Sequence, residues 1–222
     1  FEDMSLLVNL GGWQTAQIDS VGKVATSDCD GPAGVNNFIT GTYGTPYPTE
    51  VLMAQTWNTD LLYDLGLAMG QEYADVNNYG VYGPAMNTHR SAFAGRNFEY
   101  YSEDPLIAGK MGAAMVKGIQ SQHIAASVKH FAANNKETNR KHSDSRVSER
   151  ALREIYLKGF EIIVKEAQPW TIMSSYNAIN GHRASENREL LEDVLRGEWG
   201  FKGLESQDFI MNPNYAVLKE YA

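Results

Sequence analysis

Short apolar runs of strand length alternate with longer segments of helical periodicity along most of the chain. The predicted strands are 24–27, 80–83, 125–128, 170–173 and a last strand that begins at 203–204. Between successive strands, apolar residues recur every three or four positions, as on the buried face of an amphipathic helix. Strands that alternate with helices in this way predict a mainly parallel sheet whose connections are helical.

The predicted helices are those whose apolar stripes run through 62–73, 107–119, 152–163 and 190–199. Asp104 and Pro105 precede the second stripe, where a carboxylate accepts the first free backbone amides and proline suits the first turn. The charged run Asp144–Arg150 precedes the third stripe. We interpret this run as the capped, exposed start of that helix rather than as a functional site.

Polar residues follow the predicted strands, and they include Asp30, Asn87–Arg90, Lys129–His130, Tyr176–Asn177 and Asp208. In a parallel α/β barrel, the active site is built at the carboxyl ends of several strands. The two patterns coincide, so we predict a TIM-like (β/α) barrel, incomplete or irregular, with its site at the strand ends. A doubly wound open sheet is the less favoured alternative, because no glycine-rich phosphate loop follows a predicted strand.

Composition restricts the class of partner. The chain of 222 residues has 19 Lys and Arg against 27 Asp and Glu, a formal net charge of −8. This balance argues against nucleic acid or an anionic membrane as partner, and no apolar run is long enough to span a bilayer. Cys29 is the only cysteine, so an intrachain disulfide is excluded and a reducing, cytoplasmic compartment is favoured. The five histidines lack metal-binding spacing, so we expect neither a zinc site nor a cofactor.

Several of these motifs are weak when taken alone. Asp30 lies in the turn Asp28–Gly34, where its carboxylate could simply cap its own backbone. A lone histidine such as His130 is more often structural than catalytic, but the adjacent Lys129 would need a partner if buried. Arg96 lies in a charged segment that could be a solvated loop, but its place between glycine and aromatic residues also suits bidentate recognition of vicinal hydroxyls or of a carboxylate. Together the motifs describe a pocket for a polyhydroxylated ring.

Four longer motifs carry a resemblance. They are GRNFEYYSEDP at 95–105, KHF at 129–131, SERALREIYLKGFE at 148–161 and MSSYNAINGHRASEN at 173–187. In this order they resemble the N-terminal barrel domain of family 3 glycoside hydrolases, from about Trp13 to Phe209. The resemblance implies that residues 1–222 are one such domain, apparently truncated, without the α/β sandwich domain that carries the acid/base glutamate in this family.

The resemblance also implies roles for individual residues. Asp208 matches the nucleophilic aspartate of a retaining β-glucosidase. Asp30 matches the carboxylate that holds the far hydroxyls of the −1 sugar. The other residues that match contacts or walls of this subsite are Arg96, Lys129, His130, Met173 and Tyr176. The implied substrate is a β-glucoside or a small β-linked oligosaccharide, cleaved without a cofactor.

The sequence departs from the family pattern at Glu205–Gln207, which is more polar than the expected apolar strand, and at Phe209, which replaces a tryptophan. A β-xylosidase or arabinosidase of the same family remains an alternative, as does a sugar-binding barrel without catalytic activity. A β-N-acetylglucosaminidase is less favoured, because Ala132–Asn135 follows KHF in place of the motif typical of those enzymes. If this chain hydrolysed glycosides alone, the candidate acid/base residues would be Glu99, Glu103 and Glu137.

Overall fold

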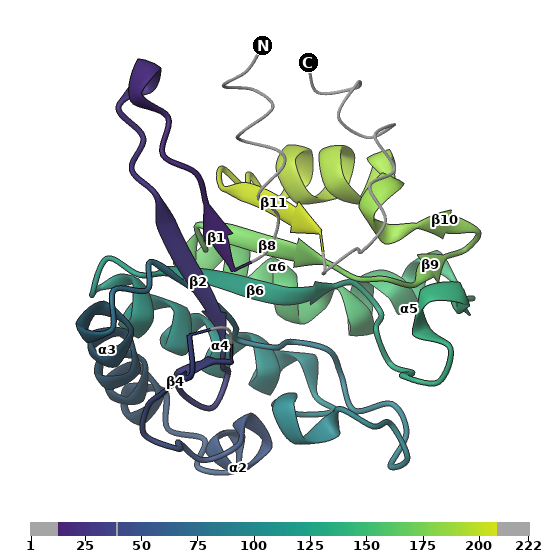
Figure 1. The fold of residues 1–222 in the computed structure, drawn as a ribbon. Coiled ribbons are helices and arrows are strands. Elements are labelled where there is room, and N and C mark those ends of the chain that lie inside the picture. Colours follow the sequence, from purple (N-terminus) through teal and green to yellow (C-terminus); the bar gives the residue numbers. More distant parts are fainter. Residues whose placement is uncertain (1–12, 39, 208–222) are drawn as a thin grey trace.

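The computed structural model describes residues 13–38 and 40–207 (Figure 1). Its main sheet contains five parallel strands that are neighbours in chain order. They are β2 (Thr26–Asp30), β5 (Gly80–Tyr82), β6 (Ala125–Phe131), β8 (Thr171–Ser174) and β11 (Leu204–Gln207). This sequential order confirms the barrel-type α/β fold. In a doubly wound sheet the strands are also parallel, but their spatial order reverses at a switch point. Within the described residues the sheet remains open.

Several short strands lie outside the predicted pattern. Antiparallel pairing extends the main sheet beyond β2 through β1 (Gln14–Thr15), β3 (Asn36–Asn37) and β4 (Thr42–Tyr43). A separate small sheet contains β7 (Asp144–Ser145), β9 (Ala178–Ile179) and β10 (His182–Arg183). The prediction for Asp144–Arg150 was therefore wrong for its first two residues. Their strand is stabilised by pairing with Ala178 and Ile179, which a local charge pattern does not reveal.

The predicted helices all form. The helical elements are η1 (Asp19–Val21), α2 (Glu50–Ala54), α3 (Thr59–Asp75), η2 (Asn97–Glu99), α4 (Pro105–Gln120), η3 (Arg140–His142), α5 (Glu149–Ala151), η4 (Leu152–Tyr156), α6 (Lys158–Ala167), η5 (Ala184–Glu186) and η6 (Glu189–Glu198). As predicted, the Asp104 carboxylate accepts the Leu106 amide at 2.7 Å and Pro105 opens α4. The Ser148 side chain caps α5. The third predicted helix is divided, because η4 has π-helical geometry between α5 and α6.

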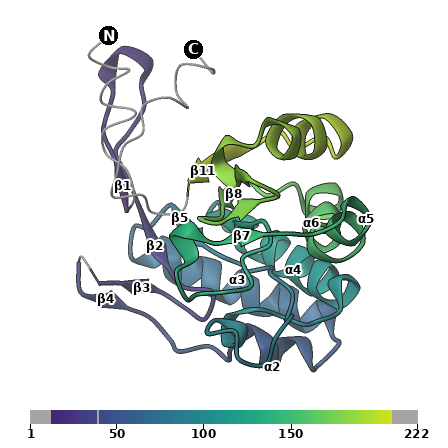
Figure 2. The same ribbon diagram turned by 90° about the vertical axis from the view of Figure 1, so that its right-hand side faces the viewer.

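Helices α3, α4 and α6 pack in chain order, with α4 in contact with both of the others (Figures 1 and 2). The approach of α3 to α4 depends on glycine, since a Cβ atom on Gly118 would lie 2.2 Å from the Tyr63 carbonyl oxygen. Beneath them, Phe131 of β6 packs edge-on against Phe160 at 5.1 Å and Trp199 at 5.9 Å between ring centroids. Because β6 is buried along nearly its whole length, its polar residues must find partners inside the protein.

Candidate active site

Asp30 is the last residue of β2, and the turn after it requires glycine. Gly31 has φ +139°, and a Cβ atom there would lie 1.7 Å from the Gly34 carbonyl oxygen. The Tyr73 hydroxyl donates a hydrogen bond of 2.9 Å to the Gly31 carbonyl. This turn fixes Asp30 at the carboxyl end of the sheet, and 43% of its side chain stays exposed.

Four charged side chains of alternating sign form a continuous series beside Asp30. Lys129 of β6 is only 3% exposed, and its Nζ lies 3.5 Å from Asp30 Oδ1 and 3.6 Å from Glu99 Oε2. Arg96 Nε donates in turn to Glu99 Oε1. We call Arg96, Glu99, Lys129 and Asp30 the ion-pair chain. Its two cations and two anions balance, and the structure thus brings together three of the predicted binding residues.

The electrostatics of the ion-pair chain keep Arg96 charged. Burial alone would lower the pKa of Arg96, but the hydrogen bond and the negative charge of Glu99 outweigh it and raise the pKa above its usual range. The side chains of Lys129 and Glu99 are 4% and 7% exposed, against 43% for Asp30. Asp30 is therefore the most exposed member of the chain, ahead of Arg96, whose side chain is 19% exposed.

His130 is buried next to the ion-pair chain and is neutral. Burial, followed by the positive charges of Arg96, Lys129 and Arg140, lowers the pKa of His130 well below its usual value. Asn87 fixes the residue, since its Nδ2 donates to the His130 carbonyl at 2.9 Å and its Oδ1 accepts the His130 amide at 3.0 Å. The same Oδ1 lies 3.3 Å from Nδ1 of the ring. The Tyr100 hydroxyl lies 3.5 Å from the same Nδ1, so Asn87 and Tyr100 together hold the ring in place.

Met173 and Tyr176 come from the next strand and the loop after it. Met173 lies on β8 and is 6% exposed. The ring of Tyr176 lies beneath two cations, with the Arg140 guanidinium 4.7 Å and the Lys141 ammonium 5.5 Å from its centroid. Arg140 is paired in turn with Glu137 at 2.9 Å. Tyr176 thus stacks against the segment 140–141, and no local sequence pattern indicated this pairing.

Asp208, the predicted nucleophile, lies outside the described residues. β11 runs parallel to β8 up to Gln207, which pairs with Ser174. Glu205 lies on this strand, where the polar sequence departs from the expected apolar pattern. Burial disfavours its ionised form and raises its pKa, despite a hydrogen bond with Ser174 and the nearby charge of Arg196. Its Oε1 is enclosed and has no hydrogen-bond partner among the described residues.

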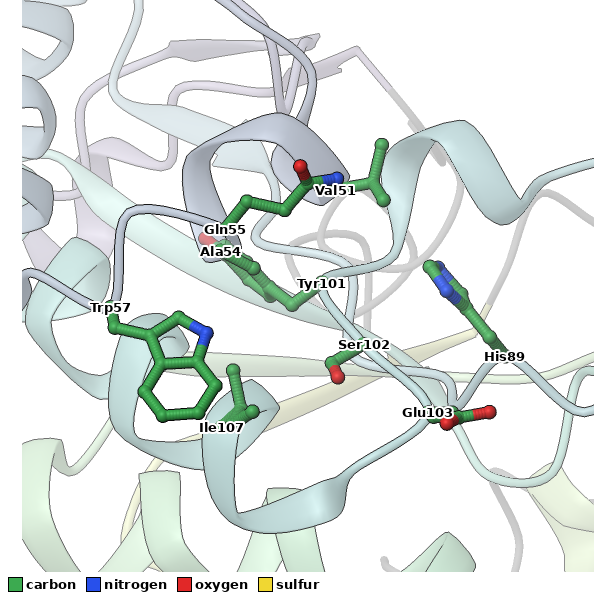
Figure 3. A pocket seen from close by; sticks show the side chains of 9 residues that line it. All are labelled: Val51, Ala54, Gln55, Trp57, His89, Tyr101, Ser102, Glu103 and Ile107. Carbon is green, nitrogen blue, oxygen red and sulfur yellow. The ribbon is translucent and has the colours of Figure 1, made fainter.

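Hollows in the described part of the molecule include the following two. One, of about 300 Å³, lies just past the ends of β6 and β8 and is lined by Ala133, Asn135, Lys136, Ser143, Asp144, Ser145 and Asn177. The other, of about 210 Å³, is shown in Figure 3 and is lined by Val51, Ala54, Gln55, Trp57, His89, Tyr101, Ser102, Glu103 and Ile107. Glu103 therefore faces a hollow that contains none of the predicted sugar contacts.

Three polar residues of the site were not predicted as its members. Sequence reasoning named Glu99 and Glu137 only as substitute acids, yet Glu99 pairs with Arg96 and Lys129, and Glu137 pairs with Arg140. Asn87 was noted at a strand end but given no role. The spacing of three between Arg96 and Glu99 on a short helical turn was an available signal for the first pair.

Over residues 13–38 and 40–207, no cluster of side chains suited to a metal ion occurs, and no helix could cross a membrane.

Comparison with known proteins gives the class of the chain. Residues 19–216 match the model of the glycosyl hydrolase family 3 N terminal domain. The class is therefore that of the glycosyl hydrolases. This chain belongs to glycoside hydrolase family 3, as the sequence motifs implied.

Among curated proteins, the chain is 54% identical over 193 residues to Beta-glucosidase A of Butyrivibrio fibrisolvens, covering 86% of this chain and 23% of that protein. It is 42% identical to the Exo-alpha-(1->6)-L-arabinopyranosidase of Bifidobacterium longum, covering 94% of this chain and 29% of that protein. The chain thus spans about a quarter of the length of these relatives.

Solved structures agree. Beta-glucosidase 3B from Thermotoga neapolitana in complex with glucose superposes with a TM-score of 0.89 at 42% identity, covering 99% of this chain and 34% of that one. The beta-glucosidase from Kluyveromyces marxianus in complex with glucose gives a TM-score of 0.92 at 41% identity, covering 97% and 26%. These values confirm the fold class predicted from the alternation of strands and helices.

Proposed function

We propose that this chain forms the sugar-binding half of the active site of a retaining β-glucosidase, with Asp208 as nucleophile. The observation that carries the proposal is the ion-pair chain, which ends at the strand edge in the partly exposed carboxylate of Asp30. A carboxylate beside a buried cation presents acceptors and donors together, as the hydroxyl groups of one sugar ring require.

Each member of the predicted set has a distinct part in this proposal. Asp30 accepts hydrogen bonds from the sugar hydroxyls farthest from the bond to be cleaved. Lys129 has three N–H bonds and two carboxylate neighbours, so one donor remains for the sugar. His130 and Arg96 contact the secondary hydroxyls of the ring, and Arg96 does so as a charged donor. The side chains of Met173 and Tyr176 form the walls of the same subsite.

The proposed chemistry is a double displacement. The Asp208 carboxylate attacks the anomeric carbon, and the bond to the aglycone oxygen breaks as a separate acid protonates that oxygen. The conjugate base of this acid then activates water to release the sugar from Asp208. We propose that the acid/base belongs to a further domain of α/β sandwich type. Relatives several times longer than this chain support that proposal.

Binding energy from the ring hydroxyls would act mainly in the transition state. Hydrogen bonds from the sugar hydroxyls to the anionic Asp30 strengthen as positive charge develops on the sugar ring, which lowers the barrier rather than only tightening substrate binding. An arabinopyranosidase is the second candidate, since the relative from Bifidobacterium longum bears that name. Comparing kcat/KM for aryl β-D-glucoside and aryl α-L-arabinopyranoside would decide between the two.

The nucleophile is tested on the full-length protein that contains this chain. A 2-fluoroglucoside with a good leaving group is expected to label Asp208, and Asp208→Asn is expected to abolish labelling. Glu103→Gln is the matched control, because Glu103 lies in the separate hollow of Figure 3 and should label normally. Labelling of Asp30 with Asp208 unmodified would show that the assignment is wrong.

A further inference from the structure

One buried carboxyl group next to the ion-pair chain has no part in the proposed chemistry. Glu50, the first residue of α2, is 1% exposed. Its Oε1 and Oε2 both accept the backbone amide of Ala85, at 3.2 and 3.1 Å. The Tyr101 hydroxyl lies beside the same carboxyl group but completes no hydrogen bond of standard geometry among the described residues. Over residues 13–38 and 40–207, no Lys, Arg or His side chain lies within ion-pair distance of the Glu50 carboxyl group.

The charges around Glu50 favour its protonated form. Glu99 from η2 and Lys129 from β6 are the ionised groups that face it, and the Tyr101 phenol completes its titratable surroundings. The ion-pair chain already balances two cations with two anions, so an ionised Glu50 would add a buried negative charge without a cation of its own. Burial, followed by the charge of Glu99, raises the pKa of Glu50 well above its usual range, although Ala85, Lys129 and Tyr101 oppose the shift.

The amide held by Glu50 belongs to the backbone that supports the site. Ala85 forms a parallel bridge with Lys129, whose amide donates to the Pro84 carbonyl at 3.0 Å. The Met86 amide donates back to the Lys129 carbonyl at 2.6 Å. Two residues further along this segment, Asn87 holds His130. Any displacement of Ala85 is therefore transmitted to the strand residues that carry the proposed sugar contacts.

We propose that Glu50 is a positioning residue: as a neutral acid it holds Ala85 against β6 and leaves Lys129 with Asp30, whereas ionised Glu50 would draw Lys129 away from Asp30. The claim that Glu50 affects catalysis rests on the proposed function, because it assumes that Lys129 and Asp30 bind the sugar. The claim that Glu50 is neutral in the folded protein is independent of the proposed function.

The sign of the pH effect follows from the raised pKa. Unfolded Glu50 ionises near the ordinary pKa of glutamate, while folded Glu50 keeps its proton to higher pH. The unfolded state then binds fewer protons, so wild-type stability falls as pH rises between these two pKa values. Glutamine has nearly the same shape, can accept from Ala85 and does not titrate. Relative to wild type, the Glu50→Gln variant should therefore gain stability across that window.

The experiment compares wild type, Glu50→Gln and Glu50→Ala in the full-length protein, with Glu103→Gln as control. Expected for Glu50→Gln is a kcat/KM for aryl β-glucoside within threefold of wild type at pH 6 and an alkaline limb displaced to higher pH or abolished. Expected for Glu50→Ala is a loss of at least tenfold, chiefly in kcat. Urea midpoints from pH 5 to 9 should rise for Glu50→Gln relative to wild type, while Glu103→Gln follows wild type throughout.

Each contrary outcome overturns the proposal. If Glu50→Gln loses activity or fails to fold as Glu50→Ala does, the ionised carboxylate is the required form. If the alkaline limb is unchanged in Glu50→Gln, Glu50 does not control the site. If the protein cleaves no glycoside, the proposed function fails separately, and the urea midpoints still decide whether Glu50 is neutral. If the urea midpoint of Glu50→Gln falls relative to that of wild type as pH rises, Glu50 is ionised in the folded protein.

Discussion

Replacing Lys129 by methionine removes the cation between Asp30 and Glu99 while nearly preserving side-chain volume. At 3.5 and 3.6 Å, each pair is worth about 5 kcal/mol of attraction at an effective dielectric constant of about 20. Most of this attraction is offset by the cost of burying the ammonium group, and solvent screens the half-exposed Asp30. Glu99 also keeps Arg96 as a partner. The expected net loss of folding stability is therefore about 1–3 kcal/mol.

The effect on catalysis is expected to be larger than the change in stability suggests. Losing a buried charged donor to the sugar, together with the partner that orients Asp30, should cost about 2–4 kcal/mol of transition-state stabilisation. This corresponds to a decrease of about 30- to 1000-fold in kcat/KM. We expect kcat to fall as well as affinity, since the anionic Asp30 that Lys129 orients binds the sugar hydroxyls more tightly as positive charge develops on the ring. The assay is steady-state hydrolysis of an aryl β-glucoside by the full-length protein, with urea unfolding of the same samples.

The matched control is Lys110→Met. Lys110 pairs with Glu166 at 2.5 Å, but both side chains are substantially exposed, at 49% and 36%. Such surface pairs contribute about 0–1 kcal/mol to stability, and this one joins α4 to α6 and is not part of the ion-pair chain. A Lys129→Met variant with kcat/KM within threefold of wild type, or one no more impaired than Lys110→Met, would refute the reasoning.

Three further predictions follow from the same geometry. Because the pKa of His130 is well below its usual value, the wild-type protein should lose stability as pH falls below 6.5, and His130→Gln should lose less, measured as urea midpoints. If the urea midpoint depends on pH equally in both proteins, the buried imidazole is not neutral. Gly31→Ala should lower stability by more than about 2 kcal/mol and reduce kcat/KM through Asp30, since its φ is +139°; wild-type thermal unfolding would contradict this. The 222-residue chain alone should acquire a sugar on Asp208 from an activated aryl glucoside without hydrolysing cellobiose, because general acid catalysis contributes about 10²–10⁴-fold. Mass spectrometry of the protein detects the bound sugar, and a glucose assay detects cellobiose hydrolysis. Sustained cellobiose hydrolysis would point to an acid/base within these residues.

The sequence by itself determined the order of the five parallel strands and of the main helices between them. Apolar runs of strand length and stripes of helical period report which side of a local segment is buried, and this information lies within a few neighbouring residues. The start of α4 is a clear case, because Asp104 caps the helix that Pro105 opens. The family motifs likewise indicated Asp30, Arg96 and Lys129, which the structure brings into one ion-pair chain, with His130 beside it. The roles of these residues remain predictions.

Only the tertiary structure decided the electrostatic state of the site. Lys129 meets Asp30 across 99 positions of sequence, and Glu50 reaches the amide of Ala85 across 35. No local pattern showed that Glu99 also reaches Lys129, that Arg140 covers Tyr176, or that Glu50 is buried. Whether a side chain is charged depends on its solvation and on the groups that face it, and both are set by strands and helices distant in sequence. The sequence therefore indicated the candidate residues of the site, whereas the fold determined their partners.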